Sequence, residues 1–477
     1  MKILIGQSYF RVLDQKELDR MMPYPPLGTL YAATILRNAG HEIIFYDGML
    51  SENPDFLVKE IEKVKPDLLL IYDDEFNYLT KMCLSNMRDA AVSFIKQAKS
   101  LSIPSLVYSS DATDYYTYYF DAGCKAIIYG EGEVTTEEVI KSFEKGTFDE
   151  DKKNIAGIKF MQDGELVVNP QRKMIEDMDA LPNPDYSFVD IEKYREIWMK
   201  NHGYFSLNIS TTRGCPYECN WCSKPLYGRT YHSRSTSNVI GQMEELNNKY
   251  AIDHIWITDD IFGLKTNWIE DFAKELKDRK IHIPYKCLSR PDLLVRGETL
   301  NQLKESGCKT IWIGAESGSQ KILDSMDKGT RVEQIYQAAK RCHQLGIEIA
   351  FFIQFGYTGE TWEDIKLTRK MIKDCVPDDI GISVSYPLPG TKFYNLVKEQ
   401  MKFKTNWKDS DDLDMMFSGN YERSFYKVLH RFVHNEYRIT KILKRKNWGK
   451  IPNLVIYIMR FINLRFKINS FLAEKPA

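Results

Sequence analysis

The feature that most constrains the fold is an alternation of short apolar runs with amphipathic stretches, which occurs twice along the chain. Within residues 1–145 the apolar runs are of the type that forms strands buried on both faces, and the stretches between them have helical spacing. Such alternation predicts a doubly wound parallel sheet, with its ligand at the carboxyl ends of the strands. The expected strands are residues 2–5, 42–46, 67–71, 105–108 and 126–129, and the expected helices are residues 27–39, 56–64, 81–101 and 134–143.

The second alternating series runs from about residue 205 to residue 400. Its six strand-and-helix units are enough for a complete or partial TIM-like barrel, in which function lies on the loops after the strands. The expected strands are residues 206–210, 254–258, 283–288, 310–314, 347–355 and 380–385, and the clearest helices are residues 237–249, 268–277 and 332–345.

A chain of 477 residues is long enough for about three domains. Between the two series, residues 155–160 and 164–168 predict a hairpin, and the turn-forming segment 181–185 marks a boundary. After residue 400 the chain is mostly helical in pattern. The predicted organisation is a sheet domain at 1–148, a linker with a hairpin at 149–203, a barrel at 204–400 and a basic helical region at 401–477.

Composition indicates a globular protein without a strong overall electrostatic field. Hydrophobic residues make up 43% of the chain, charged residues 27%, and the formal net charge is -1, which argues against a nucleic-acid partner. The charge is uneven, because residues 421–477 contain 13 Lys and Arg against 3 Asp and Glu. The sequence has no secretory signal pattern and no apolar run of about 18 residues, so we expect a cytoplasmic location.

The most specific motif is a set of three cysteines, Cys215, Cys219 and Cys222, directly after the first barrel strand. Thiolates are soft ligands that suit zinc or an iron–sulfur cluster. Closed sites normally take four protein ligands, so three cysteines predict an open coordination position for a substrate or cofactor. The alternative is a zinc site completed by a distant histidine such as His232. The other six cysteines are scattered and are expected to be buried thiols.

The spacing Cx3Cx2C, with Trp221 before the last cysteine, resembles the signature of the radical S-adenosylmethionine (SAM) superfamily. The resemblance implies that the three cysteines bind a [4Fe–4S] cluster and that SAM chelates its fourth iron. One-electron reduction then cleaves SAM to a 5′-deoxyadenosyl radical, which abstracts a hydrogen atom. The resemblance also implies a partner that is a one-electron reductant, such as flavodoxin or ferredoxin. No catalytic residue beyond the cluster ligands is assigned.

Later motifs follow in the order that this family shows. Two of these motifs have alternative interpretations. The aspartates after the second barrel strand could instead be a helix N-cap, and the arginine after the third could instead form a surface salt bridge. The motif after the fifth strand departs from the family, with Gln354 and Tyr357 where Gly and Pro are expected. The resemblance assigns Trp221, Asp259, Asp260, Arg290, Glu316, Ser317, Gly356 and Glu360 to SAM binding.

Joined to such a barrel, the first domain resembles the Rossmann-like cobalamin-binding domain of cobalamin-dependent radical SAM enzymes. The sequence contains no Asp-x-His-x-x-Gly motif, so cobalamin is expected without a histidine on its cobalt. Tyr108 and Ser109 stand where a Gly-Gly pair is common, and the alternative is a domain that has the fold without the ligand. The residues that the resemblance assigns to cobalamin are Leu27, Gly28, Thr29, Ser109, Ser110, Asp111, Thr113, Gly130, Glu131 and Gly132.

The expected function is methylation of an unactivated carbon on a small-molecule or lipid-like substrate, with cobalamin as the methyl carrier. One alternative is a cobalamin-dependent radical cyclase, oxidase or rearrangement enzyme, and a remote one is a zinc- or cluster-bearing RNA-binding module. Two basic amphipathic stretches in the tail, residues 425–443 and 454–468, either cap the barrel or lie on an anionic membrane surface.

Overall fold

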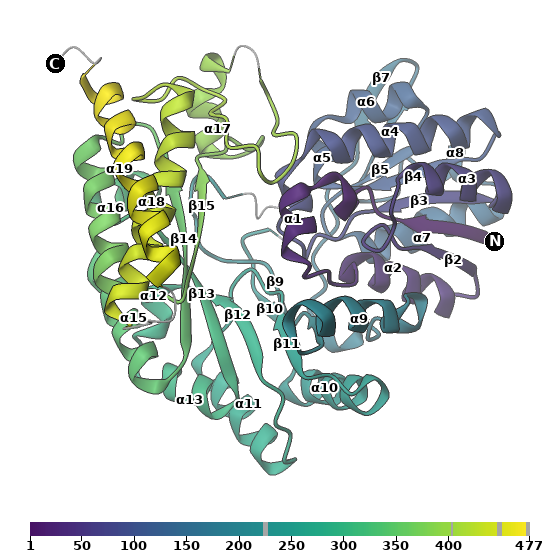
Figure 1. The fold of residues 1–477 in the computed structure, drawn as a ribbon. Helices are drawn as coiled ribbons and strands as arrows, with labels where there is room; N and C mark the ends of the chain where they lie inside the picture. Colours follow the sequence, from purple (N-terminus) through teal and green to yellow (C-terminus); the bar gives the residue numbers. More distant parts are fainter. Residues whose placement is uncertain (223–227, 402–403, 446–450, 474–477) are drawn as a thin grey trace. The chain divides into compact units, whose positions relative to one another are not determined.

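The computed structural model describes the whole chain except residues 223–227, 402–403, 446–450 and 474–477 (Figure 1). It divides into two compact units. The first unit comprises Met1–Pro216, Ser223–Asp260 and Asn406–Asp412, and the second comprises Tyr217–Cys222, Ile261–Thr405 and Leu413–Ala477. The predicted domain limits stay predictions. None of the described helices is long and apolar enough to cross a membrane.

A seven-stranded sheet with the order β2-β1-β3-β4-β5-β6-β7 forms the centre of the first unit. Its first five strands pair in parallel, as the alternation predicts. The predicted hairpin is confirmed, and it extends this sheet because β6 pairs with β5 in antiparallel orientation. The strands are β1 Lys2–Gly6, β2 Glu42–Tyr46, β3 Leu68–Tyr72, β4 Ser105–Tyr108, β5 Ala126–Ile128, β6 Ile158–Gln162 and β7 Glu165–Val168.

Helices cover both faces of this sheet, as expected from strands that are apolar on both sides. Leu68 and Leu70 of β3 belong to one buried cluster with residues of α2 and α7, whereas Leu69 and Ile71 belong to another with residues of α4. The helices of this part are α1 Gln15–Arg20, α2 Leu27–Asn38, α3 Asp55–Val64, α4 Ser85–Ser100, α5 Ser110–Asp114, α6 Tyr116–Ala122, α7 Gly132–Lys145 and α8 Phe148–Asp151.

The rest of the first unit contains the first two strands of the second series. β8 (Ser206–Ile209) and β11 (His254–Ile257) pair in parallel, with Ile209 opposite Ile257. A short antiparallel pair, β9 (Thr212–Arg213) with β10 (His232–Ser233), follows β8. The helices here are α9 Ile191–His202 and α10 Thr236–Tyr250.

The second unit is built on four parallel strands in the order β15-β14-β13-β12. These are β12 Tyr285–Ser289, β13 Cys308–Glu316, β14 Glu348–Phe355 and β15 Asp379–Val384, each close to its predicted range. The helices are α11 Thr266–Asp278, α12 Pro291–Leu294, α13 Thr299–Glu305, α14 Gln320–Ser325, α15 Val332–Leu345, α16 Trp362–Cys375, α17 Lys392–Val397, α18 Arg423–Lys444 and α19 Ile451–Ala473.

The two faces of this four-stranded sheet differ. Ile313, Phe351 and Ile382 are fully or almost fully buried on the face that helices such as α15, α16 and α18 cover. The alternating positions Trp312 and Phe352 point to the other face, where their rings lie 4.7 Å apart and Phe352 is 40% exposed. The sheet therefore has one closed apolar face and one face with accessible aromatic surface.

Candidate functional site

The three-cysteine loop follows β9, and all three cysteines are half-buried. All nine cysteines lie within the described residues, and none forms a disulfide. Among the described residues, no group of three or more His, Cys, Asp or Glu side chains is arranged so that it could hold a metal ion. The assignment of Cys215, Cys219 and Cys222 to one metal centre stays a prediction from their spacing.

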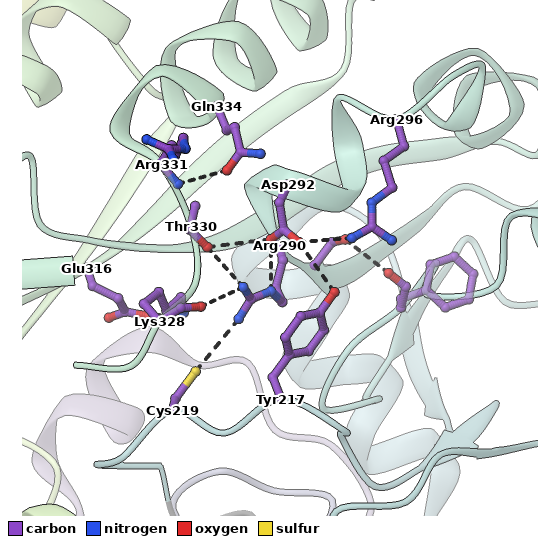
Figure 2. Close-up of polar contacts among 12 residues, drawn as sticks. Tyr217, Cys219, Arg290, Asp292, Arg296, Glu316, Lys328, Thr330, Arg331 and Gln334 are labelled. Carbon is purple, nitrogen blue, oxygen red and sulfur yellow. Dashed lines mark hydrogen bonds and ion pairs between the residues drawn. The ribbon is translucent and has the colours of Figure 1, made fainter. Parts of the chain in front are cut away.

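A buried arginine lies beside one of these cysteines (Figure 2). Nη1 of Arg290 is 3.7 Å from Sγ of Cys219, and the guanidinium stacks over the ring of Tyr217 at 3.6 Å. Arg290 Nε donates to Asp292 at 2.9 Å, and Nη2 donates to the carbonyl of Lys328 at 2.6 Å. Because Arg290 is only 5% exposed, the alternative of a surface salt bridge is wrong. Arg290 thus places a fixed positive charge beside the cysteine loop.

The end of β13 carries a second buried charge pair. Oε1 of Glu316 lies 2.8 Å from Nζ of Lys328, and both side chains are almost fully buried (Figure 2). Burial lowers the pKa of Lys328, but the negative charges of Glu316 and Cys219 more than offset this, so the pKa of Lys328 rises and the lysine keeps its charge. A Cβ on Gly314 would collide with both charged groups, which explains the glycine. No sequence signal predicts the burial of Lys328, since a lysine in a loop ordinarily faces solvent.

Glu316 itself has a φ of 56°, in the left-handed region that is costly for a residue with a Cβ. The following hydroxyls anchor the loop on α16. Ser317 Oγ lies 3.1 Å from Oγ1 of Thr368, and Ser319 donates to Asp364 at 2.7 Å. Ser317, which was predicted to bind SAM, thus directs its hydroxyl toward α16.

Several buried polar atoms near the ends of β14 and β15 have no hydrogen-bond partner among the described residues. Glu360 accepts from the backbone N–H of Gly356 with Oε2 at 2.6 Å, but its Oε1 is unpaired. Burial raises the pKa of Glu360 to about 8, so the group is a neutral acid near pH 7. Gln354 Oε1 and Ser385 Oγ are also unpaired, as is Nε1 of Trp221 on the cysteine loop. Buried polar atoms without a partner are available to hydrogen-bond a ligand.

The two predicted aspartates lie in the first unit and have partners there. Asp259 accepts from the backbone N–H groups of Thr211 at 2.7 Å and Thr212 at 3.0 Å, and burial raises its pKa to about 6. Asp260 pairs with the buried Lys81 at 2.7 Å, a residue that the sequence did not single out. Neither aspartate is a helix N-cap, because Lys265 has that position at α11.

An acidic cluster, Asp73, Asp74 and Glu75, follows β3 at the carboxyl edge of the seven-stranded sheet. All three side chains are buried, and burial raises the pKa of Asp74 to about 6 and that of Glu75 to about 8. The sequence analysis missed this cluster, although three acidic residues directly after a fully apolar strand were a usable signal. Each carboxylate accepts hydrogen bonds. Asp73 accepts from the N–H and the hydroxyl of Ser8 at 2.7 and 3.0 Å, Asp74 from the N–H of Gly28 at 2.8 Å, and Glu75 from the N–H of Ser110 at 3.0 Å.

The residues assigned to cobalamin lie at or near this edge, but most of their polar groups already have partners. Arg88 donates twice to Asp111, at 2.7 and 2.6 Å, and Arg213 ion-pairs with both Glu131 and Glu133 at 2.5 Å. The hydroxyls of Thr29, Thr113 and Tyr108 donate to the backbone carbonyls of Tyr72, Ser109 and Gly130, respectively, and the hydroxyl of Ser109 accepts from the N–H of Asp111. Leu27 is fully buried, and Gly132 packs against Tyr72 and Tyr108.

Gln7 and Glu133 keep unpaired atoms at this edge, and only in Gln7 is the whole polar group unpaired among the described residues. Gln7 follows β1 and is 1% exposed, and neither its amide nitrogen nor its amide oxygen has a hydrogen-bond partner among the described residues. Cobalamin is fringed with amide groups, which pair well with an amide side chain. The ring of Tyr108, which stands where a glycine is common, stacks on the ring of Tyr72 at 4.2 Å. The residues present therefore fit a large amide-bearing ligand at Gln7, and the cysteine loop beside Arg290 fits an iron–sulfur cluster.

These features define a class of protein: an α/β fold with a cysteine loop beside a buried arginine and with unpaired buried polar groups at its strand ends. Residues 209–372 match the family model of the radical SAM superfamily. This part of the chain is therefore a radical SAM domain.

Known proteins of this class match most of the chain. A relative in Pyrococcus horikoshii, named as an uncharacterized methyltransferase, is 28% identical over 82% of this chain and 82% of its own length. The anaerobic magnesium-protoporphyrin IX monomethyl ester cyclase of Rubrivivax gelatinosus is 25% identical over 80% of this chain and 67% of its own length.

A solved structure shows the same fold at low sequence identity. The radical SAM methyltransferase TsrM from Kitasatospora setae, determined with cobalamin and a [4Fe-4S] cluster bound, gives a TM-score of 0.67 at 17% identity. The match covers 84% of this chain and 75% of that structure. The predicted fold class, a Rossmann-like sheet followed by a radical SAM barrel, is confirmed.

Proposed function

We propose that this enzyme binds a [4Fe–4S] cluster, SAM and cobalamin, and methylates an unactivated carbon. The observation that carries the proposal is the cysteine loop whose middle thiol contacts the buried Arg290 at 3.7 Å. The names of the Pyrococcus and Kitasatospora proteins support methyl transfer. When bound, the cluster supplies one electron to cleave SAM, and cobalamin supplies the methyl group.

The chain's own residues bind and orient these groups. Cys215, Cys219 and Cys222 would ligate the cluster, with Arg290 stabilising the thiolate of Cys219. The neutral carboxyl of Glu360 offers a donor as well as an acceptor to an adenosine, and its burial excludes water. A one-electron reductant of the flavodoxin or ferredoxin type would supply the electron, in the cytoplasm.

The open sheet face of the second unit favours a flat apolar substrate. Trp312 and Phe352 lie side by side there, and Gly381 leaves room for both rings, because a Cβ would come within 3.3 Å of Phe352 and 3.4 Å of Trp312. Aromatic side chains bind flat ring systems by stacking. A ring-bearing or lipid-like substrate fits this face better than a small ion.

A second candidate is a radical cyclase without methyl transfer. It is favoured by the match to the Rubrivivax gelatinosus protein, which is named for a cyclase. The two functions differ in their SAM products, because only methyl transfer leaves S-adenosylhomocysteine.

The test is anaerobic reconstitution with iron and sulfide, followed by incubation with SAM, dithionite and cobalamin. We expect 5′-deoxyadenosine and S-adenosylhomocysteine by mass spectrometry, and cobalamin retained through gel filtration. Cys219→Ala should reduce 5′-deoxyadenosine at least about 100-fold, whereas Cys342→Ala, a buried thiol of α15, should retain it. 5′-Deoxyadenosine without S-adenosylhomocysteine would favour the cyclase, and loss of cobalamin on the column would exclude methyl transfer from it. Equal activity in both variants would overturn the cluster assignment.

A further inference from the structure

The last helix, α19, packs on the fold by one face only (Figure 1). Phe461 stacks on Phe432 of α18 at 4.7 Å, and Phe471 meets Phe425 edge-on at 5.9 Å. Ile468 on the same face is 1% exposed. α18 in turn packs against α16, where Arg369 makes a double contact with Glu436 at 2.8 Å. The inner face of α19 is thus fixed by ordinary apolar packing.

The outer face of α19 is apolar as well, and it is exposed. Val455, Met459, Ile462 and Phe466 are 53%, 60%, 49% and 70% exposed. Their spacing of four, three and four residues places them in a single stripe along the helix. Ile458, which is 39% exposed, widens the stripe. Single exposed apolar residues are common on protein surfaces, but a continuous stripe of large ones indicates a contact.

The charges around this stripe indicate the kind of partner. Arg460, Arg465 and Lys467 are exposed on α19, and at 100° per residue they lie on both sides of the stripe. The helix contains no Asp or Glu. A second copy of this chain would bring the same positive charges against one another, whereas an anionic surface would neutralise them. Long basic side chains beside an apolar stripe reach to lipid head groups while the stripe enters the acyl boundary.

We propose that the outer face of α19 lies on the surface of an anionic phospholipid membrane. Val455, Met459, Ile462 and Phe466 insert at the head-group boundary, and Arg460, Arg465 and Lys467 bind lipid phosphates. This contact is independent of the proposed chemistry, because it involves neither the cysteine loop nor the open sheet face.

The test is cosedimentation of the full-length protein with vesicles of 70% phosphatidylcholine and 30% phosphatidylglycerol, compared with phosphatidylcholine alone. We expect at least tenfold tighter binding to the anionic vesicles, weakening as salt is raised. Arg465→Gln with Lys467→Gln should weaken it roughly tenfold or more, since each basic residue near such a surface contributes about fivefold. Met459→Glu with Phe466→Glu should abolish it.

A matched control is Leu396→Glu, because Leu396 of α17 is 60% exposed, like Met459, but lies on another helix. This variant should bind vesicles as the parent protein does, and circular dichroism should show all variants folded. Equal binding by the parent and Met459→Glu/Phe466→Glu proteins, or none by the parent, would overturn the proposal. A dimer in analytical ultracentrifugation that the same double variant dissociates, without vesicle binding, would assign the stripe to a second copy instead.

Discussion

The carboxyl edge of the seven-stranded sheet and the strand ends of the second unit use buried polar groups in opposite ways. At the first edge the acidic cluster and the Arg88–Asp111 pair have hydrogen bonds within the protein, whereas the Gln7 amide and Oε2 of Glu133 have no partner among the described residues. At the second, Glu360, Gln354 and Ser385 each carry an unpaired buried atom. A buried polar atom without a partner costs stability unless a ligand supplies one. The first edge is therefore largely complete by itself, whereas the second needs its ligand.

The largest expected effect comes from breaking the ion pairs of Arg213 at the first edge. Arg213→Met leaves Glu131 and Glu133 buried without their cation, so we expect the free energy of unfolding to fall by about 3–5 kcal/mol. Denaturant unfolding followed by circular dichroism measures this.

The matched control for this change is Arg172→Met, which removes an ion pair with the partly exposed Glu138. Its cost should be about 1 kcal/mol or less. Similar losses in the two variants would show that the first edge does not depend on its internal pairs.

At the second edge, removing a polar group should cost binding more than stability. Glu360→Ala breaks one hydrogen bond, from Gly356 N–H, so the free energy of unfolding should fall by about 1 kcal/mol. The affinity of the reconstituted protein for SAM should fall roughly tenfold, measured by calorimetry under anaerobic conditions. Glu363→Ala, whose side chain is 76% exposed at the start of α16, should leave SAM affinity unchanged. Unchanged affinity in Glu360→Ala would remove that residue from the SAM site.

The acidic cluster predicts how stability changes with pH. Burial raises the pKa of Glu75 from 4.5 to about 8, so between these values the folded protein keeps a proton that the unfolded chain has released. Stability therefore falls as the pH rises through this window. The Glu75→Gln variant has no carboxyl to ionise at this position. Between pH 6 and pH 9 we expect the Tm of both proteins to fall, with the fall about 3 °C smaller in the variant.

An exposed glutamate provides the comparison for this measurement. Glu52→Gln should follow the parent protein across the same pH range. If Glu75→Gln also follows the parent, the carboxyl of Glu75 is already ionised at neutral pH and the cluster is less closed than the structure indicates.

The fold and the three-cysteine motif could be predicted from the sequence, but the partners of the buried charged groups could not. Strands such as β2 and β4 have the predicted limits, because four or five apolar residues between turn signals leave few alternatives. The burial of Lys81 and Lys328 could not be predicted. Each forms an ion pair with a carboxylate from another element, and no local sequence pattern indicates that pairing. The hairpin was predicted as part of a linker, but its pairing with β5 is non-local and has no signature in its own residues.

The smallest expected change in stability concerns Gln7, whose amide has no hydrogen-bond partner among the described residues. Gln7→Leu replaces a buried amide that has no partner with an apolar side chain of similar size, so the free energy of unfolding should stay within about 1 kcal/mol of the parent value or rise. If cobalamin pairs with this amide, its affinity should fall about fivefold or more, measured by the cobalamin absorbance that co-elutes in gel filtration. Gln15→Leu, on the exposed side of α1, should retain the cofactor. A loss of stability without loss of cobalamin would mean that Gln7 is part of the internal network, and the two edges would then differ more sharply: only the second would be built around a ligand.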